Sequence, residues 1–173
     1  MSQQPDEKRP TAENAADEGE KYLEFEDTVT LQTTSDDLWE TISDPEVLTA
    51  CVPGAETIER VSERKYTVEA TRGVSKLTLS LTGEAEFVEM NPPEYIVTVA
   101  TAFDAKTGSE FEVLGAMEMT EHDDAVDLSY KAEVTYSGGA AGISKRIIRP
   151  IVQRDVNTYF DNVRERVEDE PAT

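Results

Sequence analysis

Residues that could carry acid–base or nucleophilic chemistry are few in this sequence. The single histidine, His122, lies in an acidic turn, where we expect a solvated imidazole rather than a metal ligand. The single cysteine, Cys51, follows an apolar segment and has no basic neighbour, so we expect a small buried hydrophobe rather than a nucleophile. A Gly-x-Ser-x-Gly motif and a glycine-rich phosphate loop with lysine are missing. The sequence therefore predicts no catalytic residue and no metal site.

Three tyrosines and one glycine-rich segment remain as weaker candidates. Tyr66, Tyr130 and Tyr159 could act as acids or bases, but each lies in an apolar pattern and is interpreted as an amphipathic lining residue. The segment from Gly138 to Gly142 joins a predicted strand to a predicted helix, where backbone N–H groups could hold an anion. A flexible entry turn is the interpretation we favour for it.

The elements that must position these residues follow from hydrophobic alternation. Apolar residues at every second position predict a first strand over residues 22–31 and six more over residues 55–61, 64–71, 74–89, 95–103, 111–119 and 126–136. In the fifth of these, Tyr95, Val97, Val99 and Phe103 mark the strand. Short turns such as Asn91-Pro92-Pro93 require antiparallel neighbours. The alternation predicts one buried and one solvated face.

Two short helices are predicted between the first and second strands. Thr34 and Ser35 are N-cap candidates for the first helix, whose apolar side carries Leu38, Trp39 and Ile42. Asp44-Pro45 places an N-cap and a first-turn proline at the start of the second helix, which ends near Cys51.

The segment from Gly138 to Val167 is predicted to begin with a short flexible run and to continue as a long C-terminal helix. Its apolar residues recur every three or four positions, over a length of roughly 40 Å. The apolar side shifts around the helix at Arg149-Pro150, where proline removes a backbone donor. The sequence therefore predicts a kink or break near Arg149.

Small residues on the predicted inner face of the sheet indicate where a cavity could lie. Gly83, Ala85, Gly115 and Ala132 leave volume opposite the helix, although glycine can also mark strand bends. Both interpretations stay open. The predicted lining residues are Leu79, Leu81, Gly83, Phe111, Val113, Gly115, Met117, Tyr130, Val152, Val156 and Tyr159.

The charge of the chain is strongly acidic. Its 37 acidic and 16 basic residues give a formal net charge of −21. This balance argues against nucleic acid as a partner, because phosphate contacts need lysine and arginine. A carboxylate-rich surface suits a cytoplasm with molar salt, so we expect a halophilic origin; an acidic mesophilic protein is the alternative.

One basic cluster stands against this background. Lys145, Arg146, Arg149 and Arg154 lie near the start of the predicted C-terminal helix, and no acidic residue occurs between Glu133 and Asp155. Cations at a helix N-terminus oppose its dipole, so the cluster needs another explanation. Either it pairs with acidic residues across the fold, or it contacts an anionic partner or lipid headgroup.

Cysteine content and the distribution of apolar residues indicate the cellular location and the domain organisation. A lone cysteine and the lack of an apolar leader predict a reducing, cytoplasmic location. No run of about 18 apolar residues occurs, so no transmembrane span is expected. We expect a disordered acidic tail over residues 1–20, one domain over residues 21–168 and a short tail over residues 169–173.

The order of elements and several motifs resemble a known family. A strand, two short helices, a six-strand meander and a long helix resemble the helix-grip domain of START-type, Bet v 1-like and polyketide-cyclase-like proteins. Three segments resemble the G subunit of carbon monoxide dehydrogenase: Leu38 to Leu48, Ala50-Cys51-Val52-Pro53-Gly54-Ala55-Glu56, and Tyr159-Phe160-Asp161-Asn162-Val163. The resemblance implies an α+β helix-grip fold, with a seven-stranded curved antiparallel sheet around the C-terminal helix.

The same resemblance implies a function. Members are similar to small-molecule carriers whose apolar cavity takes a lipid-like or quinone-like ligand, and some serve molybdenum-containing CO dehydrogenase-type enzymes at the membrane. We therefore favour a noncatalytic accessory protein with no covalent cofactor. A polyketide-cyclase-like or hydratase-like enzyme acting in the same cavity is the alternative, and it requires titratable groups that point inward. Some members extend past the C-terminal helix into a hydrophobic membrane-binding tail. We do not expect such a tail after Thr173. Any contact of this protein with a membrane is therefore expected to be peripheral.

Overall fold

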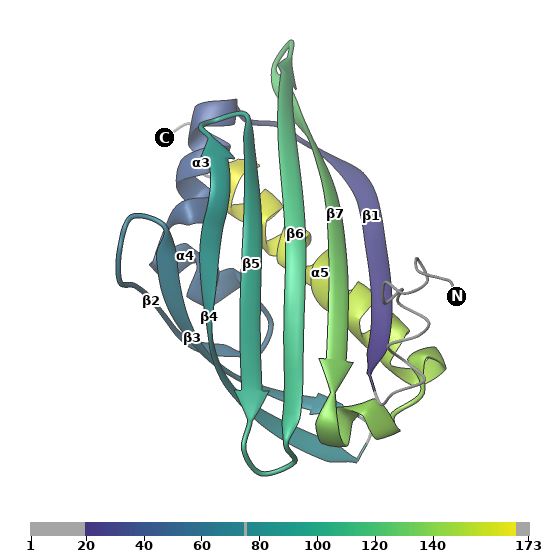
Figure 1. Cartoon of the computed structure of the whole chain (residues 1–173). Coiled ribbons are helices and arrows are strands. Elements are labelled where there is room, and N and C mark those ends of the chain that lie inside the picture. The colour runs from purple at the N-terminus through teal and green to yellow at the C-terminus, as the bar shows by residue number, and fades with distance from the viewer. Residues whose placement is uncertain (1–19, 75, 169–173) are drawn as a thin grey trace, which may run out of the picture.

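Seven antiparallel strands curve around one long helix in the computed structural model, which describes residues 20–74 and 76–168 (Figure 1). Apart from Glu20, the tails predicted over residues 1–20 and 169–173 lie outside these ranges. The strand order is β1-β7-β6-β5-β4-β3-β2, and neighbours pair antiparallel throughout, so the predicted α+β helix-grip class is confirmed. The strands are β1 (Lys21–Leu31), β2 (Ala55–Arg60), β3 (Lys65–Val74), β4 (Leu77–Asn91), β5 (Tyr95–Asp104), β6 (Ser109–His122) and β7 (Ala125–Ser137).

The two short helices after β1 begin where the capping residues predict. In α3 (Ser35–Ser43), the Thr34 side chain accepts a hydrogen bond from the Asp37 amide at 3.1 Å. In α4 (Pro45–Cys51), the Asp44 carboxylate accepts one from the Glu46 amide at 2.8 Å, and proline occupies the first turn. Each cap satisfies a backbone donor that has no partner within its own helix.

The C-terminal helix α5 (Lys145–Glu168) is preceded by a 3-10 turn, η1 (Gly138–Gly142), and runs through Pro150 without interruption. The helix follows the entry turn that the sequence predicts at Gly138–Gly142, and a break near Arg149 is wrong. Pro150 lies in the second turn on the exposed side, where the unpaired carbonyl of Arg146 can reach water. The helix does not need a break to bury both of its apolar sides, because one of them is left partly in solvent. Ile147 is 48% exposed, whereas Ile148 is buried.

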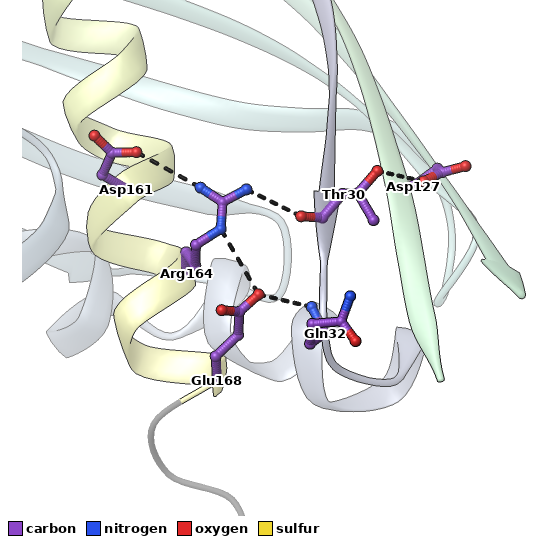
Figure 2. Close-up of polar contacts among 6 residues, drawn as sticks. All are labelled: Thr30, Gln32, Asp127, Asp161, Arg164 and Glu168. Carbon is purple, nitrogen blue, oxygen red and sulfur yellow. Dashed lines mark hydrogen bonds and ion pairs between the residues drawn. The ribbon is translucent and has the colours of Figure 1, made fainter. Parts of the chain in front are cut away.

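The C-terminal end of α5 is fastened to the free edge of β1 (Figure 2). The guanidinium of Arg164 donates to the carbonyl of Thr30 at 3.0 Å, and the carboxylate of Glu168 accepts from the amide of Gln32 at 2.8 Å. Arg164 also lies 3.6 Å from Asp161 and 3.7 Å from Glu168, which holds its side chain in place. An edge strand that would otherwise offer unpaired backbone groups is thereby covered.

The apolar core divides into two clusters. The larger cluster fills the space between β1, β7, α3 and α5; among its buried members are Leu23, Phe25, Leu31, Leu38, Leu128, Tyr130, Phe160 and Val163. The smaller cluster joins Tyr66, Phe87 and Ile96, with Trp39 and Leu48 packed against it. Between these clusters, the inner faces of β4, β5 and β6 are less completely covered.

Candidate functional site

The partial exposure of apolar residues indicates a half-covered apolar space between α5 and the middle of the sheet. The backbone of α5 comes close to β1, α3 and α4, whereas β4, β5 and β6 are not among the strands that it approaches closely. Figure 1 shows α5 crossing behind these strands at an angle. The backbone of α5 therefore approaches the sheet most closely on its β1 side.

Side chains on both walls of this space are partly exposed. A helix packed flush on a sheet would bury them, so their exposure indicates room between the two layers. The partly exposed residues on the sheet side are Leu77, Leu81, Phe111, Val113, Gly115 and Met117. Those on the helix side are Ile151, Val152, Val156 and Tyr159.

Two glycines on the inner face of the sheet have different roles. A Cβ added to Gly115 would find nothing within 4 Å, so this glycine borders open space. A Cβ added to Gly83 would overlap the carbonyl oxygen of Thr101 and lie 2.7 Å from Cα of Ala102. Gly83 is therefore required by a close approach of β5. The two interpretations of the small inner residues apply to different glycines.

The structure separates the predicted lining residues into two groups. Leu79 and Tyr130 are buried in the larger core cluster, with the Tyr130 ring stacked on Phe160 at 5.1 Å between centroids. The other nine are partly exposed. That they line a ligand cavity stays a prediction.

Sequence reasoning missed the contribution of β5. Residues Thr98, Ala100 and Ala102 face inward, because they pair with Gly115, Val113 and Phe111 of β6. The residues that mark this strand in the sequence lie on its outer face, where Phe103 is 46% exposed. The small size of the inward residues was the available signal, and the larger apolar residues of the opposite face concealed it.

The motifs behind the family resemblance meet at one place beside this space. The side-chain amide of Asn162 on α5 donates to the carbonyl of Cys51 at 2.9 Å. Cys51 is buried, as predicted, and its desolvation raises the pKa of its thiol. Gly54 adopts a φ of +84°, and its missing side chain makes room for the methylenes of Arg72. The Cys-Val-Pro-Gly segment therefore positions the α4–β2 connection against α5.

One ion pair spans the layers here. The guanidinium of Arg72, on the inner face of β3, donates to both carboxylate oxygens of Asp155 on α5, at 3.0 and 2.6 Å. The two side chains are 32% and 27% exposed. A bidentate pair of this kind fixes the orientation of the guanidinium.

The three candidate tyrosines are poorly suited to act as bases. The hydroxyl of Tyr66 donates to the carbonyl of Ser43 at 2.7 Å within the smaller cluster. Burial is the main factor that raises the pKa of Tyr130, and burial followed by proximity to Cys51 raises the pKa of Tyr159 well above its usual range. A phenol with a raised pKa stays protonated and can donate a hydrogen bond, but it does not accept a proton at neutral pH.

The remaining chemical candidates have structural partners. His122 is exposed at the end of β6, with Nε2 3.2 Å from the Asp127 carboxylate. In η1, the amides of Gly139 and Ala140 donate to the carbonyl of Thr107 and the hydroxyl of Ser109, at 3.1 and 2.8 Å. These donors are therefore engaged and do not support an anion site. Within residues 20–74 and 76–168, no group of three or more His, Cys, Asp or Glu could hold a metal ion.

Two members of the basic cluster hold α5 to the start of β1. The ammonium of Lys145 donates to the carbonyl of Tyr22 at 3.2 Å, and the guanidinium of Arg149 donates to the carbonyl of Glu24 at 3.0 Å. Arg149 also lies over the ring of Phe25, 5.1 Å from its centroid. These cations pair with carbonyls of the edge strand, an explanation that the sequence alternatives did not include.

The other two cations, Arg146 and Arg154, are exposed on the opposite side of α5 from the core, together with Ile147. No hydrogen bond or ion pair joins either guanidinium to another side chain in the part of the chain that the structure describes. They remain available for contact with another molecule.

Hollows on the outer surface do not resemble a site for an apolar ligand. One of about 310 Å³ is bordered by Glu20, Glu110 and Glu112, and another of about 660 Å³ by Glu59, Glu69 and Glu84. Their carboxylates would have to be desolvated by an apolar molecule, which is unfavourable. None of the helices within the described residues has the length and apolar character needed to cross a bilayer.

The fold defines the class as a helix-grip protein. Within it, the chain belongs to the CoxG family, described as the G subunit of carbon monoxide dehydrogenase, whose model matches residues 28–168. No curated protein sequence matches the chain.

Similar solved structures support the fold. A conserved protein from Geobacillus kaustophilus is 18% identical, with a TM-score of 0.77 over 84% of this chain and 95% of the other. The Zhui aromatase/cyclase from Streptomyces sp. R1128 is 17% identical, with a TM-score of 0.63 over 88% and 99%. A START superfamily protein from Mycobacterium smegmatis is 11% identical, with a TM-score of 0.65 over 84% and 97%.

Proposed function

We propose that this protein is a noncatalytic accessory protein that carries a lipid-like or quinone-like molecule in the space between α5 and the inner face of β4–β6. The observation that carries the proposal is the partial exposure of apolar side chains on both walls of that space. A ligand that covers this apolar surface removes it from water, and the binding free energy gains about 25 cal/mol for each Å² that is buried. The family supports service to a molybdenum-containing CO dehydrogenase-type redox enzyme as the biological setting.

The alternative, a cyclase-like or hydratase-like enzyme, has less support. A structural likeness to an aromatase/cyclase at 17% identity concerns the fold alone. The side chains that border the inner space are mostly aliphatic, and the tyrosines near it have raised pKa values that disfavour a base. A carrier needs only apolar walls and a way in, and these residues fit that requirement.

The carrier function is tested by filling the space. Gly115→Phe places a ring where nothing lies within 4 Å, so we expect it to displace the ligand without unfolding the protein. Gly73→Phe is the matched control, because Gly73 also has open space but lies on the outer face of β3. After equilibration with lipid extract, native mass spectrometry should show a bound lipid or quinone mass in the wild type and in Gly73→Phe, and at least tenfold less in Gly115→Phe. Absence of bound mass in the wild type would contradict the carrier function.

We further propose that Arg146 and Arg154 contact an anionic surface when ligand is exchanged. Each cation near an anionic bilayer contributes about 1 kcal/mol to the free energy of membrane binding. Reversing both charges should therefore weaken binding to anionic vesicles by at least about tenfold. The measurement is sedimentation with phosphatidylglycerol vesicles, comparing the double variant Arg146→Glu/Arg154→Glu with wild type. Lys76→Glu/Lys106→Glu is the control, since it makes the same charge change at exposed positions elsewhere. Equal loss in both double variants would show that overall charge, rather than this surface, governs binding.

A further inference from the structure

The ion pair between Arg72 and Asp155 leaves part of the guanidinium without a partner. Asp155 accepts from Nε and Nη2 of Arg72. Among residues 20–74 and 76–168, no hydrogen bond is formed by Nη1. Of the five N–H donors of this guanidinium, three therefore remain without a partner among these residues, two of them on Nη1, on a group whose orientation is fixed.

The guanidinium of Arg72 lies between the inner face of β3 and α5, at the margin of the apolar space. On the inner face of β3, Arg72 pairs with Leu79 of β4, which is buried, and Ala70 is its partly exposed inner neighbour. Its side chain extends past Gly54 to reach α5. The pair thus bridges sheet and helix across the layer in which the proposed ligand would lie.

These donors restrict the chemistry of a ligand that fills the space. A hydrocarbon would displace water from Nη1 and supply no acceptor, which leaves buried N–H groups unsatisfied. A carboxylate would satisfy them but would lie beside Asp155, in a protein of net charge −21. An uncharged oxygen acceptor, such as a carbonyl, avoids both penalties.

We propose that Arg72 is the polar anchor of the ligand site, that Asp155 positions it, and that the ligand is a long apolar molecule with an uncharged carbonyl-type oxygen near one end. This inference rests on the proposed carrier function and names the class of molecule carried. Arg72 recognises the oxygen through Nη1 while its other edge stays bound to Asp155.

The test compares three probes of equal chain length: 2-tridecanone, tridecane and tridecanoate. Dissociation constants are measured by displacement of Nile red fluorescence from the full chain. For the wild type we expect 2-tridecanone to bind about tenfold more tightly than tridecane, the effect of one good hydrogen bond, and more tightly than tridecanoate.

Variants separate recognition from structural support. Arg72→Met should reduce the ketone-to-hydrocarbon affinity ratio to about one, and Arg166→Met, the same change at an exposed position of α5, should leave it near ten. Arg72→Lys keeps a cation but loses the guanidinium fork, so the ratio should also fall if Arg72→Met does not fold. Asp155→Asn should raise the affinity for tridecanoate relative to the ketone. General loosening of the fold would weaken both neutral probes together and would leave their ratio unchanged.

Four results would overturn the inference. An unchanged ratio in Arg72→Met and Arg72→Lys, or tighter binding of tridecanoate than of the ketone by the wild type, would remove Arg72 as an anchor for an uncharged oxygen. Equal binding of all three probes would do the same and would leave the carrier function standing. Failure of all three probes and of Nile red to bind would overturn the carrier function and this inference with it.

Discussion

Gly83→Ala is expected to lower the free energy of unfolding by about 3 kcal/mol, the upper end of the usual effect of overpacking. The added methyl group would overlap the carbonyl oxygen of Thr101, which belongs to the backbone of β5 and cannot rotate away. Relief requires the β4 and β5 backbones to separate at a point where they are paired in the sheet. Urea unfolding of both proteins, followed by circular dichroism, measures the difference.

Gly115→Ala is the matched control for this prediction. It makes the same chemical change on the inner face of a strand two places along the sheet, where the added methyl group meets nothing within 4 Å. Because alanine restricts the unfolded chain more than glycine does, we expect Gly115→Ala to be neutral or to stabilise by up to about 1 kcal/mol. Equal destabilisation by the two substitutions would show that glycine is needed at both positions for backbone conformation, and that Gly115 borders no usable space.

Raising KCl from 0.1 to 2 M is expected to increase the melting temperature by about 6–12 °C. At a net charge of −21, several carboxylates must lie near one another; Glu24 of β1, for example, is directly opposite Glu133 of β7. Burial and these two carboxylates together raise the pKa of the nearby Tyr22 to about 12. If salt screens a few such repulsions of about 1 kcal/mol each, about 3 kcal/mol is recovered, and 1 kcal/mol corresponds to about 2–4 °C in a domain of this size.

Glu133→Gln tests whether carboxylate repulsion is the cause. The amide keeps the size of the side chain and removes one of two facing charges, so the variant should melt higher than wild type at 0.1 M KCl and gain less from added salt. Differential scanning calorimetry across the salt series gives both quantities. A melting temperature that is flat or falls between 0.1 and 2 M KCl would contradict the halophilic hypothesis.

The elements and their order could be predicted from the residues alone, because each element depends on its neighbours in the chain. Alternation at period two marks strands, and the capping residues Thr34 and Asp44 mark helix starts. The burial of Cys51 also followed from its local apolar context. The expectation that proline interrupts a helix was wrong at Pro150, since α5 continues through this residue. Ile147 is left exposed in the continuous helix.

Features that depend on contacts between distant segments became visible only in the folded chain. Gly83 and Gly115 look alike in sequence, yet β5 approaches one closely and leaves space beside the other. Lys145 and Arg149 find their partners in the carbonyls of β1, more than a hundred residues away, because the helix crosses a free sheet edge there. Alternation cannot reveal such partners, since it reports which face of an element is apolar and not which element lies opposite.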